Sequence, residues 1–319
     1  MGLWNVIKKI FSREKELCIT VFGPSGAGKT SLLACMSEEF NKADLTGFLT
    51  ADTNTFKTLK SAYEDLKKMG SGEQRTIRVE PLVPGNDNLR EHIFMISGTK
   101  VKFFDFPGGW MIPDVSGEEK EHYDSVLDIV KKSMVVIIAI DTPYLMDNQG
   151  KYKEKAKVSE VEYFLQSSLN NLSDPKLVLP KLILLAPIKC EKYTRNLKDT
   201  AKLHETIKAT YKQTVDMVTK NYRDWLALAM MPIHTIGNVE FSHFDNQHDD
   251  EMVFTRNKQP FAPRDADQPL RYAISFLLHQ KKSYWGKYDM KRIARTIRRG
   301  IHDNKDRGFE IIHGRVKIF

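Results

Sequence analysis

The sequence predicts an α/β fold in which helices cover both faces of a mostly parallel β-sheet. Short apolar runs typical of buried strands alternate along the chain with segments of helical periodicity. The first turn from a strand to a helix is rich in glycine and ends in Lys29-Thr30. The composition, 41% hydrophobic and 28% charged over 319 residues, is that of an ordinary globular protein with a sizeable core. Together these observations favour a three-layer arrangement of helix, sheet and helix.

Four apolar runs predict buried strands, and seven segments with apolar residues on one face predict helices. The expected strands are 16–22, 134–140, 181–186 and 229–236. The expected helices are 29–40, 54–69, 118–132, 158–171, 197–225, 268–279 and 287–299. Two further strands, at about 75–83 and 91–105, are expected to form one antiparallel pair at an edge, with the second broken by a turn at Ser97-Gly98.

Composition also indicates where the protein works. The three cysteines, Cys18, Cys35 and Cys190, are far apart and lack metal-binding spacing, so we expect a reducing, cytoplasmic compartment. No apolar run is long enough for a transmembrane helix, and no secretory signal is visible. The His- and Asp-rich stretch 243–250 has no accepted metal spacing and is expected to be a solvated loop.

The net charge of +8 is concentrated after residue 280. Residues 281–319 carry 12 Lys/Arg against 4 Asp/Glu, whereas the preceding 280 residues carry 37 of each sign. We expect an amphipathic helix at 1–13, a nucleotide-binding domain at 14–282, and an extension at 283–319 formed by a basic helix and a β-hairpin around Gly314. The N-terminal helix could lie in a membrane interface, or dock onto the protein's own surface or a partner. The basic C-terminal segment could bind anionic lipid, nucleic acid or an acidic partner, or be a solvated helix folded on the domain; nucleic acid is less favoured because no recognition signature is present.

The clearest motif is Gly23-Pro-Ser-Gly-Ala-Gly-Lys-Thr30, which matches G-x-x-x-x-G-K-[ST] between a strand and a helix. Glycines let backbone N–H groups turn inward around phosphates, and the helix N-terminus adds partial positive charge. Lys29 is expected to reach the β- and γ-phosphates, and the Thr30 hydroxyl to bind Mg²⁺. The expected nucleotide-binding residues here are Gly23, Ser25, Gly26, Ala27, Gly28, Lys29, Thr30 and Ser31.

A second acidic element, Asp105-Phe-Pro-Gly108, follows an apolar strand. Asp105 can hold Mg²⁺, and Gly108 can offer its N–H to the γ-phosphate, so the loop would respond to that phosphate. Asp141 is the alternative Mg²⁺ residue, because it also ends an apolar strand, as the acidic residue of an ATPase would. It is followed by Thr142-Pro143, without an adjacent Glu to polarise water.

Ile188-Lys189-Cys190-Glu191 follows the expected strand 181–186, where GTPases place [NT]-K-x-D. The stem of Lys189 would lie along the base, and Glu191 would accept two N–H bonds from guanine. Ile and Glu depart from the motif, which leaves a solvated charged turn as the alternative. Thr235-Ile-Gly237 could add backbone contacts to the base.

The order of these motifs resembles the translation-factor-like, or Ras-like, class of P-loop GTPases, and more narrowly the bacterial double-GTPase and YcjX-like groups. The resembling segments are 23–30, 105–108, 186–193, 232–241 and 263–278. The resemblance implies a six-stranded sheet, GTP/GDP and Mg²⁺ as ligands, and a switch threonine that completes the Mg²⁺ site. Thr76 fits that role best, and Thr53 and Thr55 are alternatives.

One departure from the class bears on catalysis. Many Ras-like GTPases carry a water-orienting Gln directly after D-x-x-G, but Gly109 and then Trp110 stand here. We therefore expect a GTPase with slow intrinsic hydrolysis, whose site is completed by a protein partner, a homodimer or another residue. Two further hypotheses remain: an ATPase that uses Asp141, and a nucleotide-binding scaffold with negligible hydrolysis.

Overall fold

The structure is a computed structural model. It describes residues 16–42, 49–78, 89–96, 99–107, 118–147, 149–169, 179–245, 251–280, 287–303, 307–312 and 316–318. The expected N-terminal helix at 1–13, the turn at 97–98 and Gly108 lie outside these residues. No helix in the described part of the chain is long and apolar enough to cross a bilayer.

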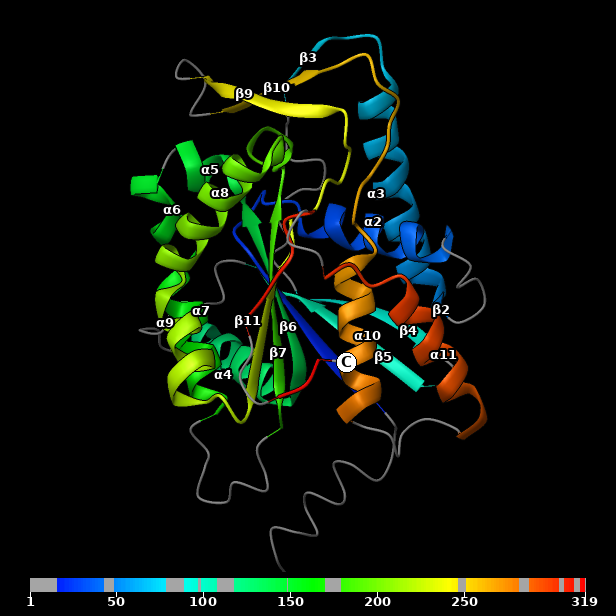
Figure 1. Cartoon of the computed structure of the whole chain (residues 1–319), viewed down its shortest axis with the longest axis vertical. Coiled ribbons are helices and arrows are strands. Elements are labelled where there is room, and N and C mark those ends of the chain that lie inside the picture. The colour runs from blue at the N-terminus through cyan, green and yellow to red at the C-terminus, as the bar shows by residue number, and fades with distance from the viewer. Residues whose placement is uncertain are drawn as a thin grey trace, which may run out of the picture.

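A mixed sheet forms the middle layer of the molecule (Figure 1). Its strands, in spatial order, are β11 (Glu310–Ile312), β8 (Leu226–Met230), β7 (Lys181–Ile188), β6 (Ser133–Asp141), β1 (Glu16–Phe22), β5 (Thr99–Asp105), β4 (Arg90–Ile96) and β2 (Leu49–Ala51). The five strands from β8 to β5 are parallel. Every residue of β6, β7 and β8 is buried, because helices cover both faces of these central strands.

The α/β fold with a mainly parallel sheet is confirmed, but the expected six strands are wrong: the described residues form eight in this sheet. β2 pairs antiparallel with β4 at one edge, and β11 pairs antiparallel with β8 at the other. Both added strands have three residues, too few to show a periodic pattern. The hairpin expected around Gly314 falls partly outside the described residues.

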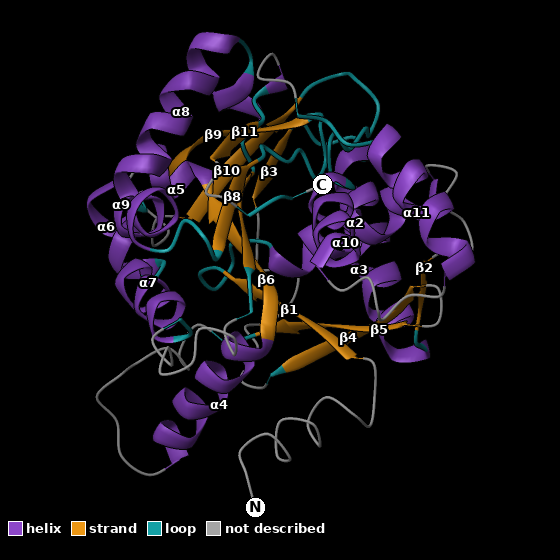
Figure 2. Ribbon diagram, turned by 60° about the horizontal axis from the view of Figure 1, so that its bottom comes forward, coloured by secondary structure: helices purple, strands orange, loops and turns teal. Residues whose placement is uncertain are grey.

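Two groups of helices form the outer layers (Figures 1 and 2). On one side lie α2 (Lys29–Lys42), α3 (Thr53–Ser71), α10 (Gln268–Gln280) and α11 (Lys287–Arg299). On the other lie α4 (Glu118–Lys132), α5 (Thr142–Asp147), α6 (Gln149–Lys155), α7 (Val158–Ser167), α8 (Leu197–Thr210) and α9 (Lys212–Asp216). The long helix expected at 197–225 is interrupted: Tyr211 leaves helical geometry, and a π-helix, η4 (Met217–Asn221), follows α9. The Tyr211 hydroxyl shares a buried 3.0 Å hydrogen bond with that of Tyr152, which ties the interruption to α6.

A second, three-stranded sheet lies beyond the carboxyl ends of the parallel strands (Figure 1). It consists of β3 (Thr76–Arg78), β10 (Glu251–Arg256) and β9 (Val239–Asp245), in that order. The expected pairing of 75–83 with 91–105 is therefore wrong. β4 and β5 form a hairpin with each other, and β2 occupies the free edge of β4, so β3 pairs with β10 instead. The stretch 243–250 is also not purely a loop, because β9 extends through residues 243–245; residues 246–250 lie outside the described part of the chain.

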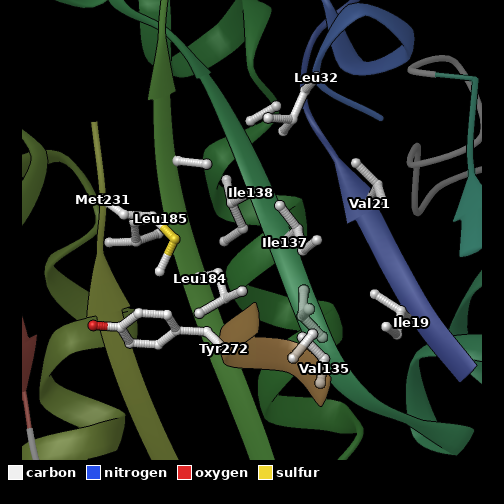
Figure 3. Close-up of a cluster of buried hydrophobic side chains, with 14 of the residues drawn as sticks. Ile19, Val21, Leu32, Val135, Ile137, Ile138, Leu184, Leu185, Met231 and Tyr272 are labelled. Carbon is white, nitrogen blue, oxygen red and sulfur yellow. The ribbon is translucent and has the colours of Figure 1, made fainter. Parts of the chain in front are cut away.

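The core is continuous from the sheet into both helical layers. Figure 3 shows branched aliphatic side chains of β1, β6 and β7 packed together, with Leu32 and Tyr272 contributed by α2 and α10. α10 is buried from Gln268 to Leu278, so this helix belongs to the interior. The rigid packing beneath the parallel strands fixes the loops at their carboxyl ends, where sites in such sheets are found.

Candidate nucleotide-binding site

The phosphate loop, residues 23–30, connects β1 to α2. Gly28 has a φ of 104°, and a Cβ there would lie 3.2 Å from the Cδ1 atom of Ile188. A Cβ at Gly23 would lie 2.8 Å from the Ala139 carbonyl oxygen. The glycines therefore let the loop pack between the carboxyl ends of β6 and β7, which larger residues would prevent.

Lys29 begins α2, and its ammonium group turns back into the loop. Nζ donates to the carbonyl oxygens of Gly23 at 3.1 Å and Pro24 at 3.3 Å. It also lies 3.7 Å from Oδ1 of Asp105. The ammonium is thus held at the N-terminus of a fourteen-residue helix, where an anion is favoured.

Asp105 is the last residue of β5 and lies beside Val21 of β1 in the parallel register. Burial raises the pKa of its carboxyl group, and the charges of Lys29 and Arg90 act in the opposite direction. Its buried Oδ1 has no hydrogen-bond partner among the described residues. Mg²⁺ prefers oxygen ligands, so this free carboxylate oxygen and the hydroxyl of Thr30, the second residue of α2, fit such an ion.

Asp141 ends β6 on the other side of β1 and has a different partner. Its Oδ2 lies 3.0 Å from Nζ of Lys189 and it is almost fully buried. Burial raises the pKa of this carboxyl group as well, and Lys189 opposes that shift. The two candidate Mg²⁺ carboxylates are thus separated by a strand, and it is Asp105 that contacts the lysine of the phosphate loop.

Lys189 connects the base-reading segment to the phosphate loop. Its backbone is left-handed, with a φ of 54°, and its Nζ donates to the Gly26 carbonyl oxygen at 2.9 Å. On its other side, Nζ lies 3.9 Å from Sδ of Met252 in β10. One side chain therefore joins the phosphate loop, the end of β6 and the second sheet.

Glu191 lies in a 3₁₀ turn, η3 (Glu191–Thr194), and its carboxylate is buried. Oε1 accepts a hydrogen bond from the Gly237 amide at 3.4 Å. Burial raises the pKa of Glu191 to about 7. Because Cys35 of α2 donates its thiol to the Thr235 carbonyl, the 235–237 segment lies between the turn and the phosphate-binding helix.

The family model that matches this chain is that of the Double-GTPase 2 family, over residues 17–251. The chain belongs to the Double-GTPase 2 family. A search of curated proteins finds no match.

Some solved structures are similar to this chain at low sequence identity. The GTPase-like domain of Ski7 from S. cerevisiae, described as bound to GTP, is 14% identical with a TM-score of 0.33, over 74% of this chain and 45% of that one. A second Ski7 structure, bound to GDP and inorganic phosphate, has the same identity and TM-score. A mutation variant of SsGBP is 15% identical with a TM-score of 0.30, over 73% of this chain and 52% of that one. This chain thus spans about half the length of these proteins.

The structure brings most of the expected site residues together. Hydrogen bonds join Lys29 to Gly23 and Lys189 to Gly26, and Asp105 lies beside Lys29. Ser25 and Gly26 are exposed at the rim of the loop, Ala27 is buried, and Ser31 follows Thr30 in α2. Gly108 lies outside the described residues.

The threonines considered for the switch role are spread over two elements. Thr76 is exposed in β3, opposite Thr255. Thr53 is the first residue of α3, and the Thr55 hydroxyl accepts a hydrogen bond from the Ile93 amide at 2.8 Å. None of the described contacts joins these side chains to Lys29 or Asp105.

Two features of the site escaped sequence reasoning. Met252 reaches Lys189 from a strand that the sequence did not reveal. Arg90 lies directly opposite Asp105 in the β4–β5 hairpin. The pairing of Arg90 with Asp105 could have been predicted, since a hairpin centred near residue 97 places residues 90 and 105 opposite each other.

Proposed function

We propose that this protein is a Mg²⁺-dependent switch that binds GTP, hydrolyses it slowly and changes partners with its nucleotide state. The observation that carries the proposal is the contact between Lys29 and Asp105 at the phosphate loop. It puts a cation for the β- and γ-phosphates beside a free carboxylate oxygen that suits Mg²⁺.

In this proposal Thr30 and Asp105 hold the ion, and a switch threonine, Thr76 by our expectation, completes the site when the γ-phosphate is present. Gly108 would offer its amide to that phosphate. When Mg²⁺ is bound it neutralises charge on the β- and γ-phosphates; the chain's own contribution is to orient the triphosphate through Lys29 and the loop amides. Hydrolysis is slow because Gly109 has no side-chain amide to orient the attacking water. A protein partner or a second copy of the chain would raise the hydrolysis rate.

The guanine base would lie between Lys189 and Glu191. The Lys189 stem is anchored at its tip by the Gly26 carbonyl and Asp141, so its methylenes can lie against a base plane. The Glu191 carboxylate lies where two N–H groups of guanine could replace the Gly237 amide as its donors. Adenine lacks this pair of donors, and so guanine is preferred.

The first test measures the melting temperature of the whole chain with GDP, GTP, ADP or ATP in Mg²⁺. A ligand at about 100 times its dissociation constant stabilises the fold by roughly 2.7 kcal/mol. We expect the guanine nucleotides to raise the melting temperature and the adenine nucleotides to do so far less. Equal stabilisation by ADP and GDP would contradict the guanine assignment.

The ATPase reading is tested by comparing Asp105→Asn with Asp141→Asn. The observation that favours Asp141 is its buried Oδ1, which has no hydrogen-bond partner among the described residues. We expect Asp105→Asn to raise the Mg²⁺ concentration needed for GTP hydrolysis by about tenfold or more, a free energy of about 1.4 kcal/mol. Asp141→Asn should leave that requirement within a few-fold. The reverse pattern would transfer the Mg²⁺ role to Asp141.

The basic segment offers a place for a partner or an anionic membrane. Arg295, Arg298 and Arg299 are exposed on α11, whereas Ile293 and Ile297 are buried. We propose that this protein is cytoplasmic and that the exposed arginines of α11 contact a partner or an anionic membrane surface. Nucleic acid is less favoured as the ligand of this face. Sedimentation with phosphatidylserine vesicles at low and high salt tests the membrane form, since such binding weakens as salt rises.

A further inference from the structure

Arg90 begins β4 at the point where β5 ends in Asp105. The two residues are direct partners in the antiparallel ladder. Side chains of directly opposed residues project from the same face, with Cβ atoms about 4.5–5.5 Å apart. The alternation along β4 agrees, because Arg90 shares its face with buried His92 and Phe94, whereas Glu91 is exposed on the other.

The positive charge of the Arg90 guanidinium group acts on Asp105. Burial raises the pKa of the Asp105 carboxyl group, and the charge of Arg90 opposes that shift. Lys29 approaches the same carboxylate from the phosphate loop, at 3.7 Å. Two cations therefore flank one carboxylate, so these three side chains carry a net positive charge before any ligand binds.

The neighbouring histidine does not remove this excess of positive charge. Burial lowers the pKa of His92 to about 4, so it is neutral at physiological pH. The Oδ1 atom of Asp105 accepts no hydrogen bond from the described residues, so the Arg90 guanidinium group does not donate to that oxygen. An Arg placed here for stability alone would be expected to form a bidentate pair with the carboxylate.

We propose that Arg90 is an internal catalytic arginine, which contacts the γ-phosphate of the bound nucleotide and stabilises the charge that develops during hydrolysis. The proposal rests on the proposed function of the site. It assigns to this chain one of the groups that would otherwise have to come from a partner.

In the step concerned, the oxygen of a water molecule bonds to the γ-phosphorus while the bond from that phosphorus to the β–γ bridging oxygen breaks. The electron pair of the broken bond stays on the GDP oxygen, and the water proton passes to the released phosphate. Arg90 donates N–H groups to the phosphoryl oxygens and exchanges no proton. Arginines in this role accelerate hydrolysis by about 10³–10⁵-fold, yet internal ones still leave turnover near 10⁻² s⁻¹.

The test compares Arg90→Ala and Arg90→Lys with the unaltered chain in single-turnover GTP hydrolysis. We expect Arg90→Ala to slow hydrolysis by on the order of 10³-fold while GDP affinity stays within about threefold. Arg90→Lys keeps the charge but loses the planar fork, so it should recover only part of the rate. Lys102→Ala is the matched control, since it removes a cation from the opposite face of the same hairpin.

A second measurement separates contact with the phosphate from an indirect effect through Asp105. GDP with aluminium fluoride mimics the transferring phosphoryl group, and should raise the melting temperature of the unaltered chain above that with GDP alone. Arg90→Ala should lose this increment. The proposal is overturned if the increment persists in Arg90→Ala, or if excess Mg²⁺ restores its hydrolysis rate. Failure of GDP to bind the unaltered chain would instead refute the proposed function itself.

Discussion

At the amino end of the sheet, the buried ammonium group of Lys181 donates three hydrogen bonds, to the carbonyl oxygens of Val130, Lys131 and Ser133. At the carboxyl end, Asp105 and Asp141 each keep a buried oxygen without a donor among the described residues. Both ends bury charge beneath similar apolar layers. At the amino end, carbonyl oxygens at the end of α4 accept hydrogen bonds from Lys181, and a helix C-terminus favours a nearby cation. This arrangement contributes to stability. The carboxyl end leaves acceptors free for a ligand.

The difference separates two uses of buried polar groups. A fully satisfied group rigidifies the structure, whereas an unsatisfied one costs free energy that a ligand can recover. The two ends should therefore respond oppositely to mutation: loss of stability without loss of binding at one, and loss of binding without loss of stability at the other.

The largest expected effect is that of Lys29→Ala on nucleotide binding. Loss of the ammonium group removes charged hydrogen bonds to the phosphates, which we expect to weaken GDP and GTP affinity by roughly 100-fold or more, about 3 kcal/mol. Titration calorimetry measures the change. The nucleotide-free melting temperature should hardly move, and unchanged affinity would remove the phosphate loop from the site.

The next effect is the loss of stability in Lys181→Met. The substitution keeps an unbranched apolar stem but leaves three carbonyl oxygens without this donor, and we expect a loss of about 2–3 kcal/mol in the free energy of unfolding. Urea denaturation measures it. GDP affinity of the folded variant should stay within about twofold, and a large loss of affinity would mean that the two ends are coupled.

The smallest effect is a pH dependence of base selectivity. Burial raises the pKa of Glu191 to about 7, and only the carboxylate can accept both guanine N–H groups. The fraction ionised increases as pH rises through this pKa, so the ratio of GDP to ADP affinity should increase about tenfold between pH values of about 6 and 8. Taking the ratio cancels the titration of the phosphates, which both nucleotides share.

Glu191→Gln supplies the control for this pH series. Its neutral amide does not titrate, so the ratio should be low and constant across the range. A wild-type ratio that also stays constant would show that Glu191 does not read the base.

The sequence predicted the elements whose pattern is local and repeated. The apolar runs of β6 and β7 and the periodicity of α2, α4 and α11 placed them within a few residues of their observed bounds. The phosphate loop, Asp105 and Lys189 were found because each follows a buried strand, and parallel strands bring their carboxyl ends to one edge.

What the sequence could not show depends on contacts between distant segments. β2 is a three-residue strand defined by its partner, and β3 lies within the expected strand 75–83 but pairs with the distant β10. Met252 reaches Lys189 across more than sixty positions. The interruption at Tyr211 is stabilised by Tyr152, which no local pattern indicates. Glu191 could be predicted as a polar residue near the base, but its burial follows from the approach of the 235–237 segment.

The pairing of β11 with β8 has a consequence for biosynthesis. β8, with five buried residues, has β7 on one side and β11 on the other, and Glu310 of β11 is also paired with His204 and Lys208 of α8. Until residues 310–312 leave the ribosome, the outer edge of β8 offers unpaired amide and carbonyl groups to any extended chain nearby. Nascent chains should therefore be prone to aggregation until this strand docks, and removal of residues 310–318 should lower soluble yield more than nucleotide affinity.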